Sequence, residues 1–208
     1  MANEAQLKDG KLISSRVADK IQAAIEKGAL TTVHALVVHQ TGGATSTSSF
    51  SSYANGQNGA HFLIDTDGSI YQTARVNQKC WHVGKIRAKC QEMKACAPDE
   101  LKAINAILFK RGESYAVRIK HLHDHESDKA YPDRYPTNED SLGIEIVSAF
   151  NEKADTYDSV NKSQNDSLAW LVSTLEALLS IGDSDIYTHG AIGYKQKSEA
   201  STASWKRP

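Results

Sequence analysis

Two histidines and a glutamate, well separated along the chain, are the residue types of a catalytic zinc site. His39 closes the apolar run that begins at Val37, and His189 opens a later segment that reaches Glu199. Two imidazoles and one carboxylate leave the fourth position of a tetrahedral zinc ion open for water or substrate, unlike a closed structural site. His39 alone would more often be a hydrogen-bonded core histidine, but the three residue types together favour metal ligands. The sequence therefore predicts a zinc hydrolase with one Zn²⁺ per chain.

Three short apolar segments are expected to position these residues. Residues 33–38 are too short for a helix and predict an interior strand that delivers His39 to its carboxyl end. Residues 142–147 predict a second strand, in which Glu145 lies on one face and the alternate apolar side chains lie on the other. Residues 186–187 predict a short strand just before the second histidine. In α/β sheets, active sites gather at such strand ends.

Two segments have the periodicity of helices. Residues 13–28 predict an amphipathic helix that begins near Ser14 or Ser15 and ends at Gly28. Residues 168–179 carry the strongest apolar stripe of the chain, and we expect that helix to end at Gly182 and to pack across the sheet.

Other segments have the composition of loops and turns. The Gly- and Ser-rich residues 41–59 predict a loop with a short helix at 48–53. Asp65-Thr-Asp-Gly68 predicts a hairpin between strands at 61–64 and 69–72, because glycine accepts the positive φ of the turn. The mostly polar residues 86–140 predict an insertion with one helix that starts at Pro98.

The composition excludes several other functions. The chain has 208 residues, of which 40% are hydrophobic and 24% charged, as in an ordinary globular protein with one domain. Its 24 Lys and Arg residues balance 25 Asp and Glu residues, so no basic surface for nucleic acid or anionic membranes is expected. No apolar run is long enough to span a bilayer, so no integral membrane association is expected, and the first residues lack the pattern of a Sec signal peptide.

The three cysteines allow two interpretations. Cys80, Cys90 and Cys96 fit neither a paired disulfide framework nor a metal knuckle. Free or partly buried thiols are the favoured interpretation, and a Cys90–Cys96 disulfide in an oxidising compartment is the second.

Five motifs in a fixed order resemble a known enzyme family. They are His39-Gln-Thr, Gly59-Ala-His61-Phe-Leu-Ile-Asp65-Thr-Asp-Gly68-Ser-Ile-Tyr71-Gln, Trp81-His82-Val-Gly84, Ser141-Leu-Gly-Ile-Glu145-Ile, and the segment from His189 to Glu199. Over residues 30–205, without much of 86–140, the chain resembles the type 2 N-acetylmuramoyl-L-alanine amidases, which include phage lysozyme-type amidases and peptidoglycan recognition proteins. Five ordered motifs are far more specific than one short pattern.

The resemblance implies a fold, a reaction and a role for each site residue. The expected fold is α/β, with a central mixed β-sheet flanked by helices in a single domain over residues 1–208. The expected reaction is zinc-dependent hydrolysis of the amide between N-acetylmuramic acid and L-alanine. By position, His39, His189 and Glu199 look like the zinc ligands, Glu145 the catalytic carboxylate and Lys197 the electrophilic lysine.

The chain departs from the family at two positions. The third ligand is more often an aspartate followed by Pro-Gly, whereas Glu199 is followed by Ala-Ser. The phage and recognition-protein branch typically has a catalytic tyrosine at the position of Ala60. Its absence, with Glu145 present, favours the branch that uses the strand glutamate.

Several aromatic residues and histidines have alternative interpretations. His61, His82, Trp81 and Tyr71 lie within the motifs and are expected to bind substrate, although the histidines suit structural hydrogen bonds and the two aromatics suit core packing equally well. His121-Leu-His123-Asp-His125 could hold a second metal if the segment is extended, but a solvated loop in the polar insertion is the favoured interpretation.

Three hypotheses on function follow. The first is a zinc amidase that acts on peptidoglycan or muropeptides, and the second is a binding module that does not cleave them. The third concerns delivery: without an export signal, a protein made in the cytoplasm suits a recycling amidase, a phage endolysin or an antibacterial effector injected into a target periplasm. Tyr131-Pro-Asp-Arg-Tyr-Pro136 and the insertion resemble amidases of contractile, type VI, secretion systems, which favours the effector. An immunity protein and the secretion machinery would then be partners.

Overall fold

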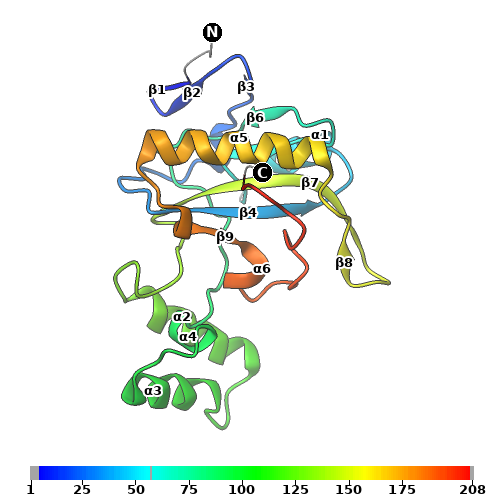
Figure 1. Ribbon diagram of the computed structural model, residues 1–208. Helices are drawn as coiled ribbons and strands as arrows, with labels where there is room; N and C mark the ends of the chain where they lie inside the picture. The colour runs from blue at the N-terminus through cyan, green and yellow to red at the C-terminus, as the bar shows by residue number, and fades with distance from the viewer. Residues whose placement is uncertain (1–4, 57, 207–208) are drawn as a thin grey trace.

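A mixed β-sheet forms the centre of the molecule in the computed structural model, which describes residues 5–56 and 58–206 (Figure 1). Within these residues, seven strands join the sheet. All neighbouring pairs are parallel except β5 with β6 and β8 with β7. In spatial order the strands are β3 (Val17–Asp19), β6 (Ile70–Gln72), β5 (Phe62–Ile64), β7 (Ser141–Asn151), β4 (Ala35–Gly42) and β9 (Ile186–Thr188), with β8 (Thr156–Tyr157) on β7. The expected mixed α/β fold is confirmed.

The two faces of the sheet have different partners. Helix α5 (Lys162–Leu179) lies across one face (Figure 1), and its leucines pack against the alternate apolar residues of β4 and β7. Because side chains alternate along a strand, His39 and Glu145 face the other side, towards α6 (His189–Ile192). The strand face predicted for Glu145 is therefore confirmed.

Helix α5 begins and ends with recognisable caps. At its start, Asn161 and Gln164 form a capping box, in which each side chain bonds the other residue's backbone N–H. At its end, Ser180 adopts the left-handed conformation with φ of 57°. The predicted end at Gly182 is therefore two residues too late, because a serine takes the position that glycine usually occupies.

The predicted helix over residues 13–28 is wrong. This segment contains β3 and a single 3-10 turn (η1, Ala23–Ile25). A hairpin of β1 (Gln6–Lys8) and β2 (Lys11–Ile13) precedes it. Strand β3 pairs with β6, and the pairing continues with bonds from Lys20 N–H to Gln72 O and from Gln22 N–H to Thr73 O. Pairing with the sheet edge thus satisfies the backbone groups that a helix would satisfy internally.

Two smaller predictions are confirmed. Strands β5 and β6 form the expected antiparallel hairpin, and Gly68 has the positive φ of 88° that the turn requires. The expected short helix in the Ser-rich loop is α1 (Ser46–Ala54), whose N-cap Thr45 accepts a hydrogen bond from Ser48 N–H.

The insertion is more structured than expected. It contains α2 (Lys89–Glu92), α3 (Pro98–Leu108) and α4 (Tyr115–Ser127) instead of one helix, and these lie away from the sheet (Figure 1). Ala88, Ile104 and Leu122 form a small core of their own, flanked by a Cys90–Cys96 disulfide. The favoured interpretation of free thiols is therefore wrong for this pair, whereas Cys80 is free and buried. None of the helices in the described residues combines the length and apolarity needed to cross a bilayer.

Candidate active site

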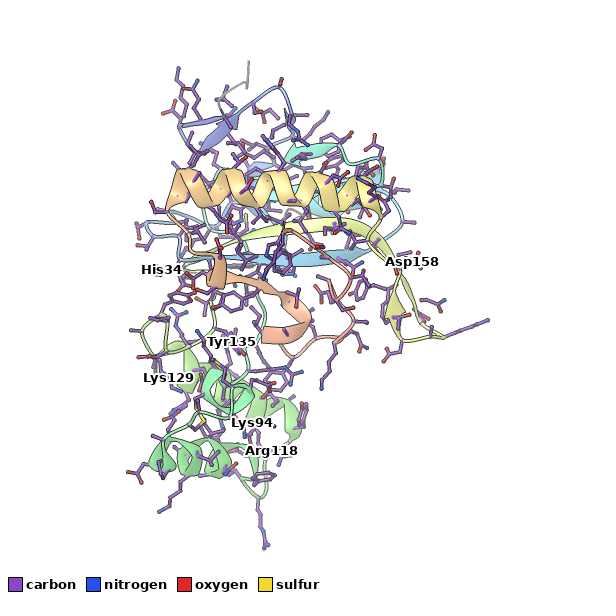
Figure 2. All side chains as sticks on the ribbon, viewed as in Figure 1. His34, Lys94, Arg118, Lys129, Tyr135 and Asp158 are labelled. Carbon is purple, nitrogen blue, oxygen red and sulfur yellow. A yellow bond between two sulfur atoms is a disulfide. The ribbon has the colours of Figure 1, made fainter. Side chains whose placement is uncertain are left out.

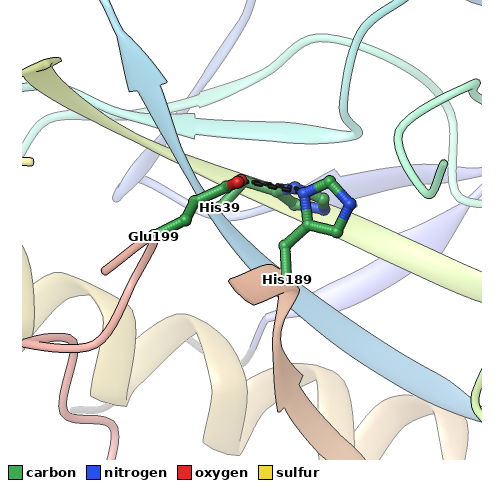
Figure 3. Close-up of side chains that lie close together, drawn as sticks. All are labelled: His39, His189 and Glu199. Atoms are coloured by element: carbon green, nitrogen blue, oxygen red, sulfur yellow. Dashed lines mark hydrogen bonds and ion pairs between the residues drawn. The ribbon is translucent and has the colours of Figure 1, made fainter. Parts of the chain in front are cut away.

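The three predicted ligands meet on the face of the sheet opposite α5. The Nδ1 atoms of His39 and His189 lie 2.9 Å apart, and Glu199 Oε1 lies 2.9 Å from the latter and 3.3 Å from the former (Figure 3). All three side chains are almost completely buried. Residues that are distant in the chain therefore present one lone-pair atom each to a common point.

The donor set fits a zinc ion. Bonds of about 2.0–2.1 Å in a tetrahedral site put neighbouring ligand atoms about 3.3 Å apart, close to the separations among these three atoms. Two imidazole nitrogens and a carboxylate oxygen are acceptors that would repel one another at this distance unless a proton or a cation lies between them. Among the described residues, His39, His189 and Glu199 form one of two groups whose ligand atoms lie within 4.8 Å of one another.

The sheet positions the first two ligands, and a glutamine positions the third. His39 lies in β4, and β9, which pairs with β4, leads directly into His189 at the start of α6. Glu199 lies in a segment without a strand or helix. Its neighbour Ala200 donates its N–H to the buried side chain of Gln40, at 2.7 Å, and Gln40 directly follows His39. The residue after the first ligand thus fixes the backbone of the last.

Burial and mutual contact shift the pKa values of the ligands. Burial, with the neighbouring His189, lowers the pKa of His39 to about 4. Burial alone would raise the pKa of Glu199, but its close contacts with His189 and His39 outweigh burial and lower the pKa to about 2. Near neutral pH the site therefore offers a neutral His39 and an ionised carboxylate, which are the forms that bind a metal.

Glu145 lies beside the ligands without joining them. It is the direct register partner of His39 across the β4–β7 pair. Its Oε2 atom is buried and has no hydrogen-bond partner among the described residues. Burial and the charge of Glu199 raise the pKa of Glu145 to about 8, although the charge of Lys195 acts in the opposite direction. A buried carboxyl group whose pKa lies near neutrality can both take up and release a proton, as a general acid–base residue must.

A cavity of about 400 Å³ opens over this group. Its lining includes His39, His189, Glu199 and Glu145, together with Trp81, whose ring is 47% exposed. The ligand face of the sheet is therefore accessible to a substrate, and an exposed aromatic ring lies at its rim.

The sequence model of one family, described as N-acetylmuramoyl-L-alanine amidase, matches residues 29–202, and this match includes every residue of the site. The chain belongs to this family. It is an N-acetylmuramoyl-L-alanine amidase. No curated protein has a matching sequence.

One solved structure supports the fold of the amidase, and two others have lower similarity to it. A selenomethionine derivative of AmpD has a TM-score of 0.54 at 16% identity, with 97% of this chain and 94% of that chain covered. The amidase LysC from Clostridium intestinale URNW has a TM-score of 0.49 at 15% identity, with 88% and 87% covered. Drosophila peptidoglycan recognition protein SD has a TM-score of 0.46 at 15% identity, with 91% of each chain covered.

The lysine of the cavity is not the one expected. Lys195 lines the cavity of the amidase, and its charge lowers the pKa values of both His39 and Glu145. Lys197, the expected electrophile, is exposed and does not line the cavity. The loop that carries both lysines packs closely on α6: a Cβ at Gly190 would lie 2.6–3.0 Å from the carbonyl oxygens of residues 196, 197 and 199.

Of the four residues expected to bind substrate, the amidase brings two into the cavity. Trp81 and His82 line it, whereas His61 and Tyr71 do not. His61 is fully buried, and backbone groups satisfy both of its ring nitrogens: Nε2 donates to Gln78 O and Nδ1 accepts from Gly143 N–H. Its burial and these bonds give His61 a structural place beneath the cavity. The ring of Tyr71 packs edge-on against Phe50.

Sequence reasoning missed two tyrosines of the site. Tyr53, from α1, and Tyr157, from β8, both line the cavity. Burial raises the pKa of both, and in Tyr157 the charges of Glu199 and Glu145 add to burial and bring the value to about 12. Neither tyrosine lies in a recognisable motif, so only the folded structure identifies them.

The histidines of the insertion do not form a second metal site. They lie on helix α4 rather than in a solvated loop, so His123 points away from the side that carries His121 and His125. The other group of ligand types in the described residues is Glu100, His125 and Glu126. In this group, the ammonium of Lys129 forms ion pairs with both glutamates and so takes the place that a cation would have (Lys129 is labelled in Figure 2).

Proposed function

We propose that this amidase holds a zinc ion with His39, His189 and Glu199 and hydrolyses the amide between N-acetylmuramic acid and L-alanine in peptidoglycan. The observation that carries the proposal is the convergence of three lone-pair atoms beside the unpaired carboxylate of Glu145 in an open cavity. Family membership supports the bond that is cleaved.

The chain's own residues account for the proton transfers. When bound, zinc would supply Lewis-acid polarisation of the carbonyl and a lower pKa for water. Glu145 takes a proton from the attacking water, whose oxygen forms the new bond to the carbonyl carbon. The same carboxyl then delivers that proton to the nitrogen as the C–N bond breaks. The products are the carboxylic acid of the lactyl group, which keeps the second proton of the water, and the free amine of L-alanine; in solution the acid passes this proton to the amine.

Lys195 supplies the positive charge that the sequence suggested for Lys197. Negative charge develops on the carbonyl oxygen in the transition state, and a well-placed cation stabilises it. Lys195 lines the cavity and acts electrostatically on Glu145 and His39, so its ammonium group is close to the reacting atoms. The exposed ring of Trp81 offers a flat apolar surface for a sugar ring.

Digestion of purified sacculi tests the activity. The protein as purified is expected to carry one zinc ion per chain and to release stem peptides with a free L-alanine amine. Glu145→Gln should bind zinc and release no peptide, and Glu152→Gln, an exposed glutamate just after the same strand, should behave as the wild type. A zinc-free protein that binds muropeptide tightly without cleaving it would support the binding module instead.

For its biological role, we propose an antibacterial effector that works outside the cytoplasm of the target cell. The Cys90–Cys96 disulfide supports this, because disulfides persist in oxidising compartments and are rare in the cytoplasm. Peptidoglycan lies in the same compartment. A recycling amidase in the cytoplasm would have no use for the disulfide, whereas an endolysin would share the site of action. An immunity protein in the producing cell and a secretion system are the partners that this role requires.

Expression with and without an added export signal tests the role. Lysis only of cells that export the protein is expected, and Glu145→Gln with the same signal should abolish it. If neither the exported nor the cytoplasmic protein lyses the cells, and the purified protein cleaves only soluble anhydro-muropeptides, the protein is a recycling enzyme. If the protein without an export signal lyses cells only when a membrane-permeabilising protein is produced with it, the protein is an endolysin.

A further inference from the structure

The two histidine ligands differ in what their second ring nitrogen contacts. His39 Nε2 lies 3.1 Å from Nδ1 of His82. His189 Nε2 is buried and has no hydrogen-bond partner among the described residues. Metal-binding histidines usually donate the second N–H to a partner, which fixes the tautomer and the ring orientation. In this site, only His39 has such a partner.

The hydrogen bonds of His82 fix the direction of the proton chain. His82 Nε2 lies 3.3 Å from the carbonyl oxygen of Ser141, which can only accept, so Nε2 carries the proton. Nδ1 of the neutral ring then has the lone pair and accepts from His39 Nε2–H. His39 Nδ1 is left without a proton, and this is the atom that faces His189 and Glu199. The nearby hydroxyl of Ser141 donates to Thr137 O and so adds no proton to the chain.

The ring of His82 is held in place from several sides. It packs against the backbone of β7 at Gly143, where a Cβ would lie 2.8 Å from the His82 ring. Its own backbone N–H donates to Asn138 Oδ1 at 3.0 Å. Its ring stands at 83° to the ring of His39. Glycine at 143 is therefore the residue that lets the imidazole reach this position.

We propose that His82 is a positioning residue, which sets the tautomer of His39 so that Nδ1 is presented to the metal. The proposal rests on the proposed zinc site and adds to it. It gives His82 a function beyond the expected contact with substrate, because the bonds of both its ring nitrogens run to protein atoms. The contact with His82 fixes the tautomer of His39 before the metal binds. His189 has no such contact among the described residues.

Two substitutions separate the hydrogen bond from the volume of the ring. In His82→Asn, the amide oxygen can take the place of Nδ1 as acceptor, whereas His82→Leu fills similar space without an acceptor. Zinc affinity is measured by competition with a chelator. We expect His82→Leu to weaken zinc binding by about 10–100-fold, the usual effect of losing such a partner, and His82→Asn to remain close to the wild type. Equal zinc affinities for wild type and His82→Leu would overturn the proposal.

A measurement on the unmodified chain keeps the test independent of folding of the variants. Long-range ¹⁵N–¹H correlation spectra of the metal-free protein with ¹⁵N-labelled histidine report which ring nitrogen carries the proton. Both His39 and His82 should be protonated at Nε2 and not at Nδ1. A proton at Nδ1 of His82 would contradict the proposed chain even if the zinc site itself is correct. Failure of the wild type to bind zinc would instead contradict the proposed function and leave the tautomer result standing.

Discussion

His39 and Glu145 face each other across the β4–β7 pair as direct partners in the parallel register. This pairing places the proposed metal ligand and the proposed proton acceptor on adjacent strands, on the same face of the sheet. Their separation is fixed by the backbone hydrogen bonds of the two longest strands among the described residues. The relative placement of the two side chains is thus set by the longest strand pair of the sheet.

Replacement of the carboxylate should separate catalysis from metal binding. Glu145→Gln is isosteric and cannot accept the proton of the attacking water, so kcat is expected to fall by about 10²–10⁴-fold. Zinc content, measured by atomic absorption, should stay at the wild-type level because Glu145 is not a ligand. A Glu145→Gln enzyme with full activity would exclude Glu145 as the base.

The same substitution should change the stability of the zinc-free protein in a pH-dependent way. Burial raises the pKa of Glu145 from 4.5 to about 8, so the folded state retains a proton that the unfolded chain releases. Stability should therefore fall as pH rises from about 4.5 to 8, and Glu145→Gln should remove this loss. Urea unfolding after chelation is expected to show no difference near pH 4 and a stabilisation of about 4 kcal/mol at pH 8. Identical unfolding free energies at pH 8 would contradict the raised pKa.

Substitution of each of two lysines in one loop tests which of them stabilises the negative charge on the carbonyl oxygen in the transition state. Lys195→Met should lower kcat by about 10²–10³-fold, as expected for loss of a transition-state contact, with a smaller change in KM. Lys197→Met should leave both constants near the wild type, because Lys197 is exposed and does not line the cavity. A large fall in kcat for Lys197→Met, with near-wild-type constants for Lys195→Met, would show that Lys197 has this role, as the sequence alone predicts.

Metal binding should stabilise the folded protein through the three ligands. Zinc at 100 times its Kd is expected to stabilise the native state by about 2.7 kcal/mol, seen as a higher Tm in a calorimetric scan. Glu199→Ala should abolish the zinc-dependent shift, whereas His121→Ala, in the insertion, should retain it. Loss of the shift in His121→Ala alone would locate the metal in the insertion.

The left-handed residue at the end of α5 offers a stabilising change. Ser180 is exposed and has φ of 57°, a conformation that glycine adopts without a steric penalty. Ser180→Gly should raise the free energy of unfolding by about 1 kcal/mol. Ser163→Gly, in the first turn of the same helix, should instead lower it. Chemical denaturation of both variants checks the sign.

The parts of the molecule predicted correctly from the sequence share one property. Strands β4 and β7, the β5–β6 hairpin and α5 have strong local patterns that agree with their tertiary contacts. Of the candidate site residues, His39 and Glu145 lie in these strands, whereas His189 and Glu199 lie outside them and are predicted from the family motifs instead. Residues 13–28 failed for the opposite reason: a helical pattern of apolar residues was overridden by pairing of β3 with the sheet edge.

Other features depend on contacts that no local pattern reports. The lysine that lines the cavity depends on the path of the loop before Glu199, which no local pattern reports. The Cys90–Cys96 disulfide depends on the turn between α2 and α3. Tyr157 reaches the cavity because β8 folds back on β7. In each case, the side chain's place is set by backbone geometry several residues away.

Strand β9 has one further consequence, because it lies at the edge of the sheet and pairs with β4 alone. His189 directly follows it, and Glu199 lies in the segment beyond. Peeling of this edge strand would leave most of the sheet intact and remove two of the three ligands together. The proposed zinc site should therefore lose its metal when this edge strand opens, and zinc exchange kinetics would measure how often it opens.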